Sequence, residues 1–137
     1  MSIQTNLDDM RSKVKDLLLL ANEMFNEEMY TMAVHNASLA LYTFLEILHL
    51  EIYGAIPVTR RLKSLIITLA PTRNIEISLK KYVDENSEFL EKLELAYRTS
   101  LASELFSKEE AASILKFVNK TIRFLSEIEN LIRKSLQ

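Results

Sequence analysis

The stretch MYTMAVHNASLALYTFLEILHLEIYG, residues 29–54, is apolar on nearly every side when it is drawn as a helix. Its apolar residues recur at three- and four-residue spacing, and further apolar residues fill the positions between them. A helix that is apolar all round must be covered all round. We therefore expect this helix at the centre of a bundle or with one face in an oligomer interface, where Ala33, Ala37 and Ala40 would let a neighbouring helix approach closely.

Four residues of this segment are candidates for the core or for a dimer face: His35, Ala37, Tyr42 and Glu46. The chain has two histidines, His35 and His49, which fall on roughly the same side of the helix but about 21 Å apart along its axis. That separation is too large for a shared ligand, so they predict no metal site. We interpret both as histidines at the edge of the core or in a dimer interface.

Amphipathic patterns on both sides of this segment predict further helices. Three are long, over residues 6–26, 87–102 and 108–134, and two are short, over residues 60–70 and 75–86. Gly54 is placed to end the central helix, Pro57 prevents its continuation, and Thr59 is placed to cap the helix over 60–70. Ser107 and Glu110 have the spacing of a capping box. The sequence therefore predicts an all-α protein, a bundle of four main helices with one or two short ones.

Composition excludes several classes of protein. The chain of 137 residues is about the size of one domain, so we expect a single domain over residues 1–137. It has no cysteine, which excludes disulfides, thiolate nucleophiles and cysteine-based zinc sites. The formal charge of −2 argues against an extensive nucleic-acid-binding surface. With no secretory signal before Leu17 and no clean apolar run of about 20 residues, we expect a cytoplasmic protein without a membrane span.

Patterns that carry chemistry are mostly missing from the sequence. A single glycine excludes the glycine-rich loops that cradle phosphates, because those loops need several positions at which only glycine lets the backbone approach. Glu88, Glu91 and Glu94 fall on an expected solvent face and form no pair suited to acid–base catalysis. We therefore expect no catalytic residues, no metal and no cofactor.

Two basic clusters remain to be interpreted. Arg60 and Arg61, with Lys63, stand near the start of the short helix over 60–70. A stripe at i, i+4 and i+7 on the last helix comprises Lys116, Lys120 and Arg123. Such clusters are more often solvated faces than sites, but a cluster near a helix start can also hold phosphate oxygens.

Two segments resemble the HEPN domain family. Residues 21–67 combine a helix, a break with an aromatic residue, an alanine-rich long helix carrying Glu46, and the Gly-x-x-Pro-x-Thr pattern GAIPVT, residues 54–59. Residues 93–115, which include YRTSLASELFSKEEA from Tyr97 onward, resemble the later segment of that family, in which Glu-Glu-Ala opens the last helix. Together the two segments cover most of the chain.

The resemblance implies an antiparallel up-and-down bundle, usually a prokaryotic homodimer, that acts alone or beside a small nucleotidyltransferase and is associated with nucleotide or RNA binding. Active relatives are metal-independent ribonucleases with an arginine followed four to six residues later by a histidine. This chain lacks that motif. Aligned on Tyr97, the Arg-Tyr pair of the family falls on Leu101 and Ala102, and a frequent histidine falls on Arg60. Arg98 is the nearby candidate replacement.

Three hypotheses follow. The first is a non-catalytic homodimer that binds a nucleotide or RNA through a groove lined by Arg60, Arg61, Tyr97 and Arg98. The second is an interaction module without a ligand, whose apolar faces dimerise or dock a nucleotidyltransferase. The third is a ribonuclease with an atypical site, which the positions of the two histidines disfavour. Whether the chain is an enzyme stays open, with the missing motif favouring a non-catalytic protein.

Overall fold

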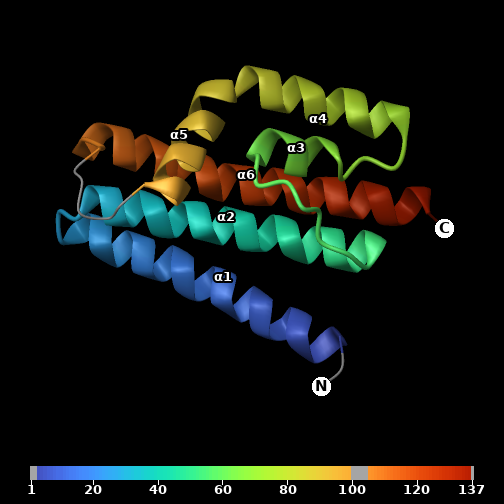
Figure 1. The fold of residues 1–137 in the computed structure, drawn as a ribbon, viewed down its shortest axis with the longest axis horizontal. Coiled ribbons are helices and arrows are strands. Elements are labelled where there is room, and N and C mark those ends of the chain that lie inside the picture. The colour runs from blue at the N-terminus through green and yellow to red at the C-terminus, as the bar shows by residue number, and fades with distance from the viewer. Residues whose placement is uncertain (1–2, 100–104, 137) are drawn as a thin grey trace.

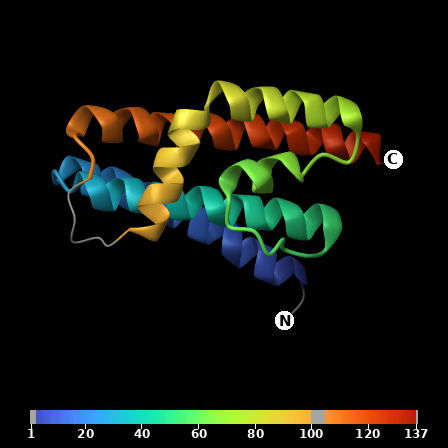
Figure 2. The ribbon, with the colours of Figure 1, turned by 45° about the horizontal axis from the view of Figure 1, so that its top comes forward.

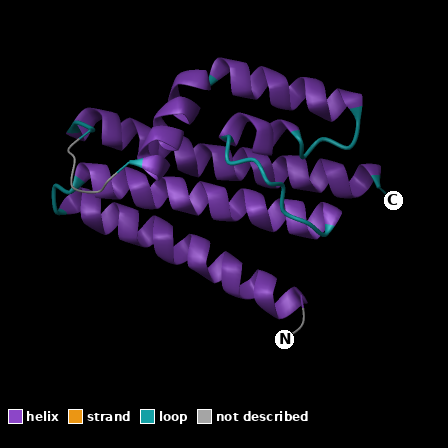
Figure 3. Cartoon of the chain, viewed as in Figure 1, coloured by secondary structure: helices purple, strands orange, loops and turns teal. Residues whose placement is uncertain are grey.

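A computed structural model describes residues 3–99 and 105–136 of the chain. These residues form helices joined by loops and turns, with no strand among them (Figure 3). In chain order the helices are α1 (Ile3–Asn26), α2 (Tyr30–Tyr53), α3 (Leu62–Ile67), α4 (Arg73–Glu85), α5 (Ser87–Arg98) and α6 (Lys108–Ser135). The prediction of an all-α fold is confirmed.

Helix α2 is the central element of the bundle. It contacts α1, α3, α5 and α6, and the views in Figures 1 and 2 both show α1 lying along it. Ala33, Ala37 and Ala40 are fully buried, as their small size allows when neighbouring helices approach closely. The chain thus covers α2 with its own helices, which is the first of the two expected arrangements.

The helices α1, α2, α4 and α6 alternate in direction along the chain, whereas the short α3 runs the same way as α2 (Figure 1). In Figure 1, α1 and α4 run one way, whereas α2 and α6 run the opposite way. Helix α5 departs from this pattern, because it crosses steeply between α4 and α2 (Figure 2). The change of direction occurs at Asn86, which separates α4 from α5 and whose side-chain amide donates to the carbonyl of Tyr82 at 2.8 Å. The helix expected over 87–102 is helical up to Arg98, and residues 100–104 lie outside the described part of the chain.

Two of the predicted helix ends follow local chemistry, and a third does not. Gly54 ends α2 in the left-handed conformation, with a φ of 74°, which glycine adopts without strain. Ser107 and Glu110 form the expected capping box at the start of α6. The prediction for Thr59 was wrong: α3 begins at Leu62, its N-cap position is Arg61, and the Thr59 hydroxyl instead accepts from the Arg61 amide at 3.2 Å.

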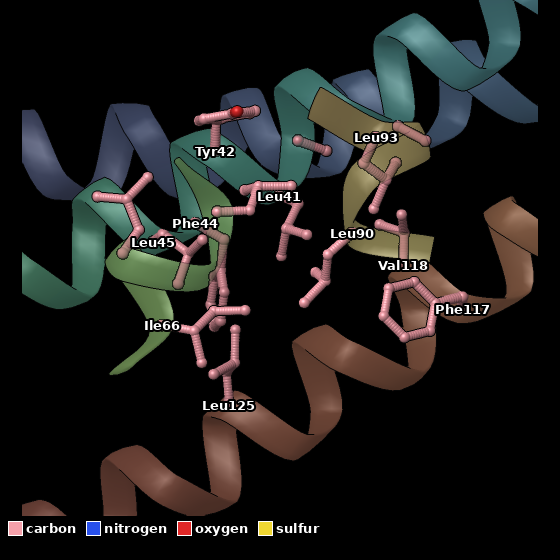
Figure 4. Packing of buried hydrophobic residues seen from close by; sticks show 14 of the residues in the cluster. Leu41, Tyr42, Phe44, Leu45, Ile66, Leu90, Leu93, Phe117, Val118 and Leu125 are labelled. Atoms are coloured by element: carbon pink, nitrogen blue, oxygen red, sulfur yellow. The ribbon is translucent and has the colours of Figure 1, made fainter. Parts of the chain in front are cut away.

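The core lies between α2 and the helices around it. Figure 4 shows side chains from several helices gathered in one space, among them Leu41 and Leu45 of α2, Ile66 of α3, Leu90 of α5 and Leu125 of α6. Buried side-chain nitrogen and oxygen atoms in the described residues all have hydrogen-bond partners. Ser38, for example, donates from α2 to the carbonyl of Leu93 on α5 at 2.7 Å. Within the described residues, no helix is both long enough and apolar enough to cross a membrane.

Candidate functional site

An open pocket lies where α5 passes the segment that precedes α3. It is lined by Thr59, Arg60 and Arg61 from that segment and by Glu94 and Arg98 from α5, and its volume is about 400 Å³. The structure therefore brings together three of the four residues that the sequence suggested for ligand binding. The fourth, Tyr97, lies beside the pocket rather than in its lining.

Arg60 is held from α2 at both its backbone and its side chain. The Tyr42 hydroxyl donates to the Arg60 carbonyl at 2.7 Å, and the Arg60 guanidinium pairs with the Glu46 carboxylate at 2.9 Å. About half of the Arg60 side chain remains exposed. Because Tyr42 and Glu46 are four residues apart on a helix, they lie one above the other on the face that meets this segment.

Tyr97 completes the support of Arg60 from the α5 side. Its ring stacks on that of Tyr42, with centroids 4.1 Å apart and planes inclined by 27°. Burial raises the pKa of the Tyr42 hydroxyl well above its usual range, and the nearby Glu94 carboxylate and Tyr97 raise it further. The Tyr42 hydroxyl therefore stays protonated at physiological pH and can keep donating to the Arg60 carbonyl.

Glu94 has a role that the sequence did not reveal. Instead of facing solvent freely, its half-buried carboxylate accepts from the Leu62 amide at 2.7 Å and so caps the start of α3. Its backbone carbonyl accepts from Arg98 Nε at 3.4 Å. Glu94 and Arg98 are one helical turn apart, and this spacing predicts that they share one surface of α5. Periodicity does not identify the Leu62 amide as the hydrogen-bond partner of Glu94.

The arginines of the pocket differ in how far they are neutralised. Arg60 is paired with Glu46, whereas the Arg61 guanidinium has no hydrogen-bond or ion-pair partner within the described residues. Arg98 reaches only a backbone carbonyl in that part of the structure. The pocket thus presents guanidinium groups with free donors beside a single carboxylate, Glu94, that already caps a helix.

The remaining candidates on α2 have structural roles in the described part of the chain. Ala37 is buried in the core. His35 is half-buried and donates from Nδ1 to the carbonyl of Ala96 at 2.9 Å. His49 is buried and donates from Nε2 to the carbonyl of Leu65 at 2.8 Å, and burial lowers its pKa despite that hydrogen bond. Neither histidine lines the pocket.

Lys63 is separated from the arginines that precede it. Its ammonium group donates to Ser87 at 2.6 Å and pairs with Glu91 at 3.1 Å, so it connects α3 to the start of α5. The hydrogen bond from Lys63, followed by its charge, lowers the pKa of the Glu91 carboxyl. The expected compact cluster of three cations is thus divided, with two of them at the pocket. Leu101 and Ala102, onto which the family motif aligns, lie outside the described residues.

Metal ligands do not gather in the described ranges, which contain no group of three or more His, Asp or Glu side chains that could hold an ion. The fold and the site therefore define an all-helical bundle with a cationic pocket on α5. A family model of the HEPN domain matches residues 8–129, and the chain belongs to the HEPN domain family. No match was found among curated proteins or among solved structures.

Proposed function

We propose that this protein is a non-catalytic HEPN domain that binds the phosphate groups of a nucleotide or of RNA in the pocket lined by Arg60, Arg61 and Arg98. The observation that carries the proposal is the convergence of these arginines, from two separate elements, on one open pocket. A guanidinium offers a planar fork of donors that matches phosphate oxygens. The free donors of Arg61 and Arg98 are therefore the groups that would meet the ligand.

The charge balance of the pocket favours a polyanion over a neutral ligand. Three guanidinium groups face one carboxylate in the lining, and Glu46 lies behind Arg60 rather than in the lining. A mononucleotide or a single-stranded RNA segment brings enough negative charge to outweigh the repulsion from Glu94. The net charge of −2 for the whole chain restricts such binding to this local patch.

A non-catalytic role follows from the surroundings of the groups that could move protons. General acid–base catalysis requires a titratable group within hydrogen-bond reach of the reacting hydroxyl, with a pKa near the working pH. Both histidines donate to backbone carbonyls away from the pocket lining, and the Tyr42 hydroxyl has a raised pKa. The Glu94 carboxylate, which does line the pocket, is engaged by the Leu62 amide.

Thermal-shift assays against mononucleotides and short RNAs, at low and high salt, test this proposal. A ligand present at about 100 times its dissociation constant adds about 2.7 kcal/mol to the free energy of unfolding, a rise of several degrees in Tm for a domain of this size. We expect a salt-sensitive rise that is lost in Arg61→Ala and Arg98→Ala. Arg123→Ala, at an exposed position on α6, is the matched control and should keep it. Equal shifts in all variants would place the ligand elsewhere, and RNA cleavage abolished by Arg98→Ala would favour the ribonuclease hypothesis.

A second candidate function is dimerisation or docking of a partner protein such as a nucleotidyltransferase, without a ligand. The observation that favours it is a group of exposed apolar side chains at the end of α2 and just after it, where Val58 is 98 % exposed and Tyr53 and Ile56 are also exposed. Side chains of this kind commonly mark an interaction site when they occur together. Light scattering of the wild type and of Val58→Ser measures the effect: a dimer weakened by Val58→Ser supports this function, and a monomer at micromolar concentration opposes self-association.

A further inference from the structure

A second open groove lies between the start of α5 and the first half of α6. It shares no lining residue with the pocket that contains Arg60, Arg61 and Arg98, which we call the arginine pocket. Its volume is about 320 Å³, and its lining is Asn86, Phe89, Ser113, Lys116, Phe117 and Lys120. We call it the α5–α6 groove. Neither the HEPN assignment nor the proposed function uses it.

The floor of the α5–α6 groove is aromatic and firmly supported. Phe89 and Phe117 stack with ring centroids 4.7 Å apart and planes inclined by 12°. Behind them, Tyr82 lies nearly parallel to Phe117 and stacks on Phe124 with centroids 4.0 Å apart. The Tyr82 hydroxyl is hydrogen-bonded to Thr121 at 2.7 Å, which fixes the row of rings in place. Phe89 is only partly buried, so an apolar surface remains available in the groove.

Positive charge along the groove is not neutralised within the described residues. Lys116 and Lys120 are exposed on α6, and neither forms an ion pair in the structure described. The carboxylates next to Asn86 and Phe89 in the sequence are already engaged: Glu85 of α4 pairs with Lys81 at 4.0 Å, and Glu88 of α5 pairs with Lys92 at 3.2 Å. An apolar floor beside two free ammonium groups calls for an occupant that is both apolar and anionic.

We propose that the α5–α6 groove binds an acidic amphipathic helix of a partner protein. Lys116 and Lys120 are four residues apart, so their helix positions are separated by about 6 Å along α6. Two carboxylates at i and i+4 of a partner helix have the same spacing as these two lysines. The same face of that helix carries an apolar side chain at i+3, which would pack on the aromatic floor. In an extended strand the residue between two carboxylates of one face points to the other face, so the apolar side chain would have to lie beyond the pair instead of between them.

A nucleic acid fits these observations less well. Single-stranded nucleic acids are bound by grooves that track many phosphates and offer aromatic faces to successive bases. Here only two lysines line the groove, and Phe117 is 4 % exposed, so Phe89 alone offers accessible ring surface. The volume suits one or two anchoring side chains better than a row of bases.

A library of helical peptides with one randomised face, selected for binding to the full chain, provides the probes. We expect the selected peptides to carry two acidic residues one turn apart with an aromatic or aliphatic residue beside them. Because exposed ion pairs are individually weak, Lys116→Gln with Lys120→Gln should reduce their affinity about tenfold. Ser113→Tyr, which fills the groove from an exposed position, should reduce it further.

Lys134→Gln is the matched control, since Lys134 is exposed on the same helix and lies outside the groove lining. It should leave the affinity unchanged, and thermal unfolding of each variant checks that the fold is retained. The proposal is overturned if no peptide is enriched, if the enriched peptides lack paired acidic residues, or if the groove variants bind them normally. Direct binding of a short oligouridylate that depends on Lys116 and Lys120, with no peptide enriched, would assign the groove to RNA.

Discussion

Replacing Glu94 with Gln should lower the stability of the fold and at the same time strengthen anion binding. The Glu94 carboxylate accepts from the Leu62 amide at 2.7 Å and also lines the arginine pocket. A glutamine keeps an oxygen that can accept the same hydrogen bond, but it removes the negative charge from the pocket. The two effects therefore have opposite signs, which an unspecific loss of structure cannot reproduce.

The size of each effect follows from the interactions that change. A hydrogen bond to a charged acceptor is roughly twice as strong as one to a neutral acceptor, so Glu94→Gln should cost about 1 kcal/mol of unfolding free energy, a fall of about 4 °C in Tm. Removing one carboxylate from a solvated pocket removes about 1 kcal/mol of repulsion toward a bound phosphate, which corresponds to about fivefold tighter binding.

Calorimetric titration with a nucleotide that shifts the wild-type Tm, together with thermal unfolding of the free protein, measures both effects. Glu91→Gln is the matched control, because Glu91 is one turn earlier on α5 and pairs with Lys63 outside the pocket. It should leave the nucleotide affinity unchanged. If Glu94→Gln binds no tighter than Glu91→Gln although its fold is intact, the arginine pocket is not the anion site.

Three further predictions concern α2. Tyr42→Phe keeps the ring stack but leaves the Arg60 carbonyl without its donor, so we expect a loss of about 1–2 kcal/mol in chemical denaturation and weaker nucleotide binding. Because the pKa of His49 is lowered in the folded state, the unfolded state binds protons more readily, so the free energy of unfolding should be full above the usual pKa of about 6.5 and fall as the pH drops below it. His49→Gln can still donate to the Leu65 carbonyl, and its denaturation midpoint should depend less on pH across this range. Glu51, whose side chain is 11 % exposed, pairs with arginines of α1 and α6, so Glu51→Gln should cost about 1 kcal/mol at low salt and less at high salt, as measured by Tm.

Most of the fold could be predicted from the sequence because the determining signals are local. Residues 29–54 are apolar on nearly every side of a helix, which predicts a helix covered on all sides, and α2 is that helix. Gly54 and the capping box at Ser107 mark helix ends through hydrogen bonds within a few residues of themselves. The start of α3 was misjudged at Thr59, because the group that caps this helix, Glu94, belongs to another element.

The candidate site was predicted less completely, since it depends on which helices are neighbours. The family resemblance contributes to the prediction of Arg60, Arg61 and Arg98, and the crossing of α5 brings them to one pocket. Periodicity could not show that Lys63 turns away to Glu91. The stack of Tyr97 on Tyr42 likewise joins residues more than fifty positions apart, so no local pattern reports it.

The support of Arg60 by α2 has a consequence for how such domains diverge. Tyr42 and Glu46, which hold this arginine, belong to the most deeply packed helix, whereas Arg61 and Arg98 sit on exposed positions that the core does not constrain. On the proposed function, substitutions at those exposed positions would alter which anion is preferred while leaving the packing of the bundle untouched. The ligand preference of such a domain would then change more readily than its architecture.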